Sequence, residues 1–405
     1  MNDRPALLGN SPLFPEKLPI IQPTLPDYET IAPQVKEIFA TGMLTKGKYL
    51  RQFEERLAEY LGVKHAVCVS SCTLGLALTY QGLGLGRLGG AQHKDAVIVP
   101  SFTFMATVHP LVWLNAMPVF VDIDPHTWNI DPARVEEAIT PRTTGIVAVH
   151  NFGNPADVEA LEEIAQRHNL RLVFDAAHGF GTLYQGRPVG GFGDAEVFSA
   201  TPTKLLVAGE GGVVATNDDG LADHIRAGRE YGNDGHYGSD FAGLNARMPE
   251  FNAILGIRSL EMLEENAERR NAVVKRFRER LERLPGLTFQ RIRPGDRCSY
   301  KDLSVLVDEG EFGLTRDQLA QALQAENIDT RKYHDPPVHT HQAYRYLAER
   351  YQGRLPVTNW VAPRSLSLPV YSHMDEATVD HICAAVETIH AHRDQVGATV
   401  ATSET

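Results

Sequence analysis

The chain has 405 residues, of which 43% are hydrophobic and 22% charged, and its formal net charge is −12. These values are typical of a soluble globular protein that is long enough for one large domain and a smaller one. The acidic balance argues against a nucleic-acid partner, because a polyanion attracts a basic surface. The four cysteines form no CxxC pair, so we expect a reducing compartment. Neither a signal peptide nor an apolar run of about 20 residues is visible, so we expect a cytoplasmic protein without membrane contact.

Short apolar segments follow one another through the first half of the chain, with helical patterns between them. Their continuous rather than alternating apolarity is typical of strands that are covered on both faces, as in a parallel sheet. We therefore expect the α/β class, with a mainly parallel seven-stranded sheet and helices on both of its faces. The expected strands are His65–Ser70, Ala96–Pro100, Pro118–Asp122, Gly145–Val149, Arg171–Asp175, Glu196–Ala200 and Gly212–Thr216.

The pattern changes after Asn245. Pro249–Leu284 predicts one long helix with many Glu/Arg pairs, and a smaller C-terminal α+β domain is expected beyond it. The elements expected in that domain are the strand Ser304–Val307 and the helices Thr315–Glu326 and Glu376–His390. We expect an N-terminal segment (1–25), a large domain (26–270), a small domain (271–392) and a flexible, polar tail (393–405).

Two residues in the large domain match the needs of pyridoxal-5′-phosphate (PLP). Asp175 ends an apolar strand, and Lys204 follows the next one. A lysine amine can form an imine with the PLP aldehyde, and a carboxylate keeps the pyridine nitrogen protonated. Ligand groups in α/β sheets lie at the carboxyl ends of strands, where Asp175 stands. Taken singly, Asp175 is equally well explained as a strand-end cap, and Lys204 is better explained as a solvated lysine, so the argument depends on their combination.

A phosphate group and a cofactor ring need further partners. Ser70–Gly75 joins a strand to a helix, where backbone N–H groups and the helix dipole favour an anion, although simple capping would explain the same residues. Ser199, five residues before Lys204, is a second candidate phosphate ligand. Phe104 is a candidate for stacking on the ring, although an aromatic residue at this spacing more often belongs to a core.

A series of segments, in order along the chain, resembles the sugar aminotransferases of the DegT/DnrJ/EryC1/StrS group. They are Gly42–Gly47, Ser70–Thr73, Pro100–Phe104, Pro118–Asp122, Val149–Gly153, Asp175–His178, Ser199 with Lys204, Gly209–Gly212 and Gly243–Met248. The likeness covers residues 25–390 and implies the fold of PLP-dependent transferases of the aspartate-aminotransferase type (fold type I). Cys72 stands where the family usually has glycine, and His178 where it often has glutamine. Relatives that act as dehydratases carry histidine in place of Lys204, so the lysine favours amino transfer.

The resemblance implies a role for each matching residue. Lys204 would hold PLP as a Schiff base and carry the proton, Asp175 would pair with the pyridinium, and His178 would hydrogen-bond the ring hydroxyl or stack near it. The remaining contacts within one chain, to the phosphate and the ring face, would come from Cys72, Thr73, Ser199 and Phe104. Asn245 would reach the phosphate of the neighbouring subunit, which implies a homodimer with shared active sites.

The implied reaction transfers an amino group from L-glutamate or L-glutamine to a nucleotide-linked 3-keto- or 4-keto-6-deoxy sugar. Burial beside the cationic cofactor would lower the pKa of Lys204 toward neutrality, as proton transfer requires. The sugar diphosphate needs cationic or N–H donors, and the candidate substrate-binding residues are Lys46, Arg331, Tyr333 and His334. A solvated loop explains the last three equally well.

Three alternatives remain open from the sequence. Gly84–Gly89 matches the G-x-G-x-x-G pattern of nicotinamide oxidoreductases, but it follows a helix and precedes a strand, the wrong context for that fingerprint. A metal site at His334, His339 and His341 fits no standard zinc spacing, so no metal is expected. The third alternative is a non-enzymatic, PLP-binding regulatory protein of the same family, which formation of pyridoxamine phosphate from glutamate would exclude.

Overall fold

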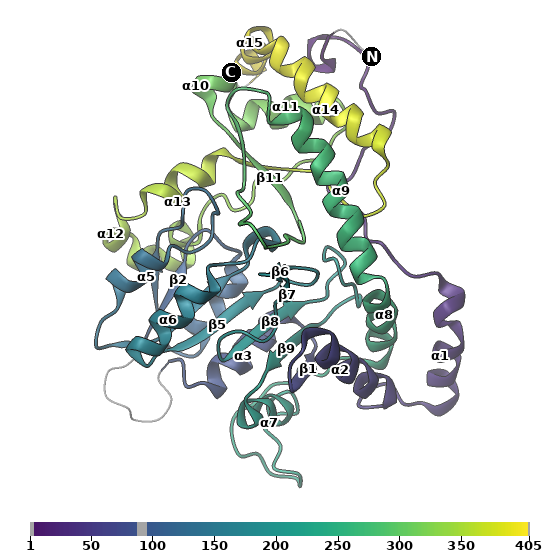
Figure 1. Ribbon diagram of the computed structural model, residues 1–405, viewed down its shortest axis with the longest axis vertical. Coiled ribbons are helices and arrows are strands. Elements are labelled where there is room, and N and C mark those ends of the chain that lie inside the picture. Colours follow the sequence, from purple (N-terminus) through teal and green to yellow (C-terminus); the bar gives the residue numbers. More distant parts are fainter. Residues whose placement is uncertain (1–3, 87–94, 404–405) are drawn as a thin grey trace.

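The computed structural model describes residues 4–86 and 95–403, and its centre is a seven-stranded sheet in the order β1-β9-β8-β5-β4-β2-β3 (Figure 1). The strands are β1 (His65–Val69), β2 (Ala96–Pro100), β3 (Met117–Val121), β4 (Thr143–Val149), β5 (Arg171–Ala176), β8 (Ala195–Ser199) and β9 (Gly212–Thr216). Of these, β9 alone runs antiparallel to its neighbours. The expected α/β class with a mainly parallel sheet is confirmed.

Helices cover both faces of the sheet, and strand residues alternate between the two cores. One face carries α2 (Lys48–Leu61), α5 (Pro132–Ala138), α6 (Val158–His168) and α8 (Glu250–Glu261). The other face carries α3 (Cys72–Gly82), α4 (His109–Trp113) and α7 (Asp219–Gly228). Along β5, Phe174 belongs to the first core and Val173 to the second. Because side chains alternate along a strand, Asp175 points to the α3 face at the carboxyl end of β5.

The stretch Pro249–Leu284 forms two helices rather than one, so that prediction was wrong. Helix α8 ends at Glu261, and α9 (Leu263–Leu281) begins beyond Met262. No proline or glycine stands at the junction, and the apolar periodicity continues through it, which is why the sequence does not reveal the break. Helix α9 runs from the large sheet to the second core (Figure 1), where Val273, Val274, Phe277 and Leu281 of its C-terminal half are buried.

The second core surrounds a smaller antiparallel sheet, β10 (Leu287–Phe289), β11 (Leu303–Val307) and β12 (Ser365–Leu368). Helices α11 (Arg316–Ala325) and α14 (Glu376–Ala391) cover it, close to their expected bounds. Apolar side chains from the N-terminal segment pack against the same core: Leu7, Leu8, Leu13, Phe14 and Leu18. Both ends of the chain therefore belong to this smaller unit, as the positions of N and C show in Figure 1.

The described part of the flexible tail expected for residues 393–405 is helical, so that expectation was wrong for residues 393–403. This part forms α15 (Arg393–Ser403), in which Val396 and Val400 are 0% and 2% exposed. The two valines lie one helical turn apart and face inward, but the small polar residues between them hide this pattern in the sequence.

The remaining elements are short or peripheral. They are α1 (Tyr28–Thr41), α10 (Glu309–Phe312), α12 (Ala348–Tyr351), α13 (Pro356–Val361) and the hairpin strands β6 (Leu183–Tyr184) and β7 (Arg187–Pro188). Of the glycine-rich pattern Gly84–Gly89, the residues from 87 onward lie outside the described residues. No helix in residues 4–86 and 95–403 is both long and apolar enough to cross a membrane.

A buried carboxylate from α8 caps helix α2. Gly47 precedes α2 and offers no side chain, and the Glu250 carboxylate accepts hydrogen bonds from the N–H groups of Gly47 (2.9 Å), Tyr49 (2.9 Å) and Leu50 (3.1 Å). Glu250 is 1% exposed, so water does not reach these groups. The first turn of α2 therefore depends on a residue that is distant in sequence.

Replacement of Glu250 by alanine is expected to lower the free energy of unfolding by about 3 kcal/mol, because three buried donors lose a charged acceptor. Urea denaturation measures the change. Glu265→Ala on α9 is a matched control, because its carboxylate is 65% exposed and pairs only with Arg269 on the surface. That control should change the free energy by about 0.5 kcal/mol or less. Equal stability of the two variants would contradict the capping role.

Candidate active site

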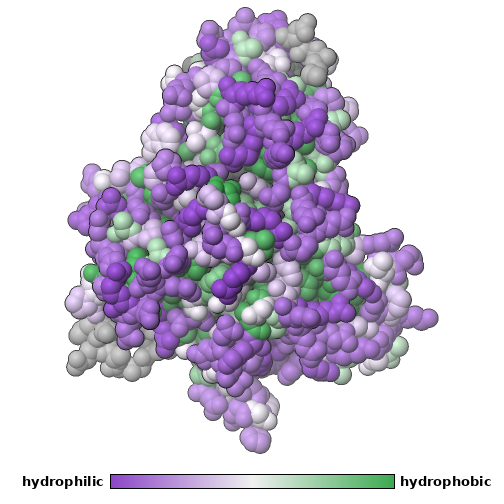
Figure 2. All heavy atoms as spheres, in the orientation of Figure 1, coloured by the Kyte–Doolittle hydropathy of each residue, from purple (hydrophilic) through white to green (hydrophobic). Residues whose placement is uncertain are grey.

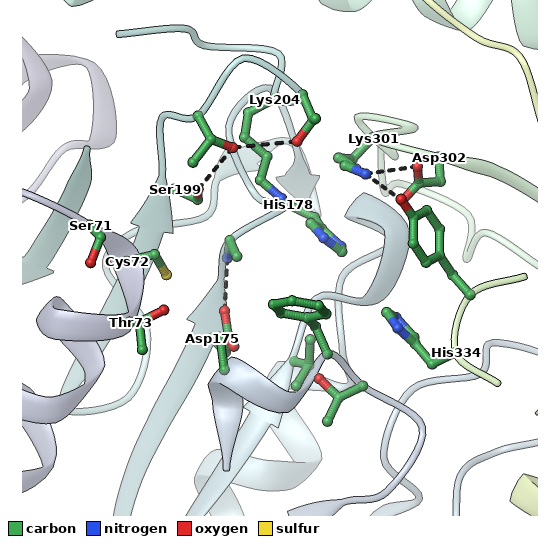
Figure 3. A pocket seen from close by; sticks show the side chains of 18 of the residues that line it. Ser71, Cys72, Thr73, Asp175, His178, Ser199, Lys204, Lys301, Asp302 and His334 are labelled. Atoms are coloured by element: carbon green, nitrogen blue, oxygen red, sulfur yellow. Dashed lines mark hydrogen bonds and ion pairs between the residues drawn. The ribbon is translucent and has the colours of Figure 1, made fainter. Parts of the chain in front are cut away.

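A cavity of about 340 Å³ lies at the carboxyl ends of β4, β5 and β8, beside the N-terminus of α3 (Figure 3). Its lining brings together most of the residues that the sequence singles out: Cys72, Thr73, Phe104, Asp175, His178, Ser199, Lys204, Tyr333 and His334. Three candidates are absent from the lining: Lys46, Asn245 and Arg331. Motif residues separated by more than 250 positions thus share one site.

The N-terminus of α3 forms one end of the cavity. Ser71 caps the helix, because its Oγ accepts the N–H of Leu74 (3.3 Å), so the capping interpretation holds for this residue. The first N–H groups of an α-helix have no partner within the helix. The Cys72 thiol is buried, and burial raises its pKa well above the usual value. A Cβ at Gly212 would lie 2.5 Å from the Cys72 nitrogen, so glycine there lets β9 approach the helix closely.

Asp175 lies at the floor of the cavity, 4% exposed. The Thr107 hydroxyl donates to Oδ2 (2.7 Å) and the Ala177 N–H donates to Oδ1 (3.0 Å). Burial raises the pKa of Asp175, while these two hydrogen bonds and the charge of Lys204 oppose that rise. A cation placed against this carboxylate would favour its charged form further. No sequence pattern indicates the contact between Thr107 and Asp175.

Lys204 projects into the middle of the cavity (Figure 3). Its backbone N–H donates to the Thr201 carbonyl (3.0 Å), which fixes the turn that follows β8. Burial, followed by the nearby charge of Lys301, lowers the pKa of Lys204 to about 8. Near neutral pH the amine is therefore available as a nucleophile or base to a far greater extent than that of an ordinary lysine.

Two neutral histidines flank the ring of Phe152. The His178 Nδ1 accepts the N–H of Phe152 (3.1 Å), so the neutral ring carries its proton on Nε2. Burial lowers the pKa of His178 well below the usual range and that of His334 to about 3. The His334 ring stacks on Phe152 (centroids 5.3 Å apart, planes at 5°), and its Nε2 lies 3.3 Å from Asn151 Oδ1. Both histidines are uncharged hydrogen-bonding groups.

Lys301 and Asp302 also line the cavity, and the sequence patterns missed them. The Lys301 ammonium donates to both oxygens of Asp302 (2.8 and 2.9 Å), and 8% and 6% of the two side chains are exposed. They precede β11 in the smaller unit, far in sequence from the motif segments. A Lys-Asp pair before an apolar strand is typical of a solvated loop, so the sequence carries no signal of its burial here.

The three candidate residues outside the cavity contact other groups. Lys46 forms an ion pair with Glu230 (3.1 Å), and the backbone of Asn245 pairs with that of Glu230. Arg331 forms an ion pair with Asp329 (2.7 Å), and 45% of its side chain is exposed. The roles expected for these three residues stay predictions.

Comparison with known proteins adds to this geometry. The profile of the DegT/DnrJ/EryC1/StrS aminotransferase family matches residues 27–387. The spore coat polysaccharide biosynthesis protein SpsC of Bacillus subtilis (strain 168) is 37% identical over 369 residues, 88% of this chain and 93% of that protein. GDP-perosamine synthase of Caulobacter vibrioides is 35% identical over 353 residues, 86% of this chain and 92% of that protein. DesI, crystallised in the presence of its TDP-sugar product, is 36% identical and superposes with a TM-score of 0.88 over 100% of both chains.

Proposed function

Because the chain belongs to the DegT/DnrJ/EryC1/StrS aminotransferase family, we propose that it uses PLP to transfer an amino group to a nucleotide-linked keto-6-deoxy sugar. The donor is L-glutamate or L-glutamine, and the acceptor carbon is a 3-keto or 4-keto position. The observation that carries the proposal is the meeting of Lys204 and Asp175 in one cavity. The TDP-sugar product of DesI and the name of GDP-perosamine synthase support a nucleotide sugar as the acceptor.

The cavity residues fit PLP in three respects. The N-terminus of α3 and the Ser199 hydroxyl offer N–H and O–H donors for a phosphate. Asp175, buried and held by Thr107, suits a protonated pyridine nitrogen. The Lys204 amine reaches into the same cavity (Figure 3). When bound, PLP supplies an electron sink for the carbon that carries the amino group.

The chain's own residues would then position the reactants and move the proton. Lys204, with a pKa of about 8, can take up and release a proton near neutral pH. The Nε2–H of His178 can donate to the ring hydroxyl, and Phe104, which is 53% exposed, would cover the ring at the cavity mouth. Tyr333 and His334, which also line the cavity, would contact the substrate.

The reaction is tested as two half-reactions. Protein loaded with PLP is mixed with L-glutamate or L-glutamine without acceptor, and we expect one equivalent of oxo acid with conversion of the cofactor to pyridoxamine phosphate. Nucleotide-linked 3-keto and 4-keto sugars are then added, and amino-sugar formation is followed by mass spectrometry. A protein that takes up PLP but converts neither donor would contradict the proposed reaction and favour the regulatory alternative.

The lowered pKa of Lys204 predicts a pH dependence of cofactor uptake. Only the neutral amine attacks the PLP aldehyde, so the rate of uptake should rise with pH and level off above pH 8, near the pKa of about 8. Stopped-flow absorbance of cofactor-free protein mixed with PLP measures this rate. An exposed lysine has a pKa of 10.5, so a rate that keeps rising well beyond pH 8 would contradict the shift.

We further propose a homodimer with shared active sites. Asn245, expected to reach the phosphate in the partner, lies outside the cavity of its own chain and close to Lys46. The exposed apolar side chains Met43 (53%) and Leu44 (52%) lie in the segment of Lys46, and the exposed Tyr231 (54%) donates its backbone N–H to Leu244, next to Asn245. Such side chains are few on the face drawn in Figure 2, where hydrophilic atoms cover most of the surface. Light scattering should give about twice the mass of one chain, and a monomer would overturn the proposal.

A further inference from the structure

The Lys301–Asp302 pair lies at the opposite end of the cavity from the N-terminus of α3. Figure 3 places Ser71, Cys72 and Thr73 on one side, the pair on the other, and Lys204 between them. If the α3 end holds the cofactor phosphate, as in the proposed function, the substrate must occupy the end that carries the pair. Lys301 and Asp302 are therefore placed to contact the substrate rather than the phosphate.

The charged side chains that line the cavity indicate a role for Lys301 in binding an anionic group of the substrate. Among the described lining residues, Lys204 and Lys301 are the cationic side chains, because burial keeps His178 and His334 neutral. An amino-acid donor brings at least one carboxylate, and a buried carboxylate needs a cation or several N–H donors. Lys204 reacts with the cofactor in the proposed function. Within one chain, Lys301 remains as the cavity cation that can meet the donor carboxylate.

Lys301 can exchange partners without leaving Asp302 as an isolated buried charge. Arg270, on α9, is 2% exposed. Burial lowers the pKa of the Arg270 guanidinium to about 10, and the negative charge of Asp302 opposes this decrease. The Arg270 Nη1 donates to the Tyr300 carbonyl (3.3 Å), and its Nε makes no hydrogen bond within the described part of the chain. Asp302 is thus bonded to Lys301 and also acts on the nearby charge of Arg270, which stays in place when Lys301 turns to an incoming anion.

The backbone at Lys301 is held by a hydrogen bond, whereas the Lys301 ammonium, at the end of a flexible side chain, can change its position. The N–H of Lys301 donates to the Phe152 carbonyl (3.0 Å), which ties the smaller unit to the large sheet. The Lys301 ammonium also lies 5.1 Å from the centre of the Tyr333 ring. A lysine on a fixed backbone has three donors on a flexible stem, so a small rotation transfers them from Asp302 to a substrate group.

We propose that Lys301 binds a carboxylate of the amino-acid donor, and that Asp302 holds Lys301 in place until the donor competes for it. The inference rests on the proposed function and deepens it, since it names the residue that recognises the donor. It also gives the two charged residues opposite effects on donor binding, which a purely structural ion pair would not have.

The test measures the donor concentration that gives half-maximal conversion of the PLP-loaded protein in the first half-reaction. Lys301→Gln should raise that concentration by about 10- to 100-fold, because a charge-assisted hydrogen bond to the donor is lost. Asp302→Asn should lower it, because the competitor for Lys301 is removed. A change for both glutamate and glutamine assigns the α-carboxylate, and a change for glutamate alone assigns the side-chain carboxylate.

Control variants distinguish a loss of donor binding by Lys301 from a folding defect and from a failure of the proposed function. Lys275→Gln, on the exposed face of α9, should behave as wild type. The double variant Lys301→Gln/Asp302→Asn removes both charges of the ion pair together, so it should fold, load PLP and still bind the donor weakly. Wild-type protein that converts no donor would refute the proposed function. Wild-type conversion with unchanged donor dependence in Lys301→Gln, or weaker donor binding in Asp302→Asn, would refute only the role of Lys301.

Discussion

Replacement of Lys204 by alanine is expected to abolish amino transfer while leaving the fold intact. The variant loses the amine that bonds to the cofactor and the group that moves the proton, so the rate should fall at least about 10³-fold. Stability should not suffer, because removal of a buried ammonium also removes its desolvation cost. Formation of oxo acid from L-glutamate measures the rate, and thermal unfolding measures the stability.

Borohydride reduction gives an independent readout for Lys204. In wild-type protein, reduction should attach the cofactor covalently to the peptide that contains Lys204, and mass spectrometry of the digest locates the adduct. Lys204→Ala should show no adduct there, whereas Lys275→Ala, with its lysine 78% exposed on α9, should match wild type. An adduct on a different lysine, or transaminase activity retained in Lys204→Ala, would contradict the assignment.

Asp175→Asn is expected to slow the first half-reaction by about 10²- to 10³-fold. Asparagine keeps the shape and can still accept the hydrogen bond from Thr107, but it cannot stabilise a protonated pyridine nitrogen. The loss should therefore appear in the rate constant at saturating donor more than in the donor concentration required. Single-turnover absorbance measurements with L-glutamate separate the two effects.

Thr107→Val is the matched comparison for Asp175→Asn. It removes one hydrogen bond to the carboxylate but leaves its charge and its contact with the Ala177 N–H, so a loss of about tenfold is expected. Equal rates for Asp175→Asn and wild type would contradict the pairing of Asp175 with a ring cation. Equal losses in the two variants would show that the position of the carboxylate matters more than its charge.

The large unit could be predicted from the sequence because its signals are local. Each strand of the main sheet is a continuous apolar run, and residues such as Asp175 and Ser199 stand directly at strand ends. The parallel arrangement then brings those ends together, so order along the chain was enough to anticipate the site. The α/β class and the seven strands followed from these patterns alone.

Features that depend on tertiary contact could not be predicted. Lys301 and Asp302 become cavity residues only because the smaller unit folds against the carboxyl edge of the large sheet. The break at Met262 has no helix-breaking residue, and the buried valines of α15 are too few to form an amphipathic pattern. In each case the decisive interaction joins two segments that are distant in the chain, and the sequence of neither segment indicates that it contacts the other.

The sharing of the second core by both ends of the chain has a consequence for synthesis on the ribosome. Leu7, Leu8, Leu13, Phe14 and Leu18 leave the exit tunnel first, yet the strands and helices that cover them lie beyond residue 280. The main sheet, whose strands all lie between residues 65 and 216, can assemble while translation continues. The smaller unit closes last, so this apolar segment stays uncovered until the elements beyond residue 280 have been made.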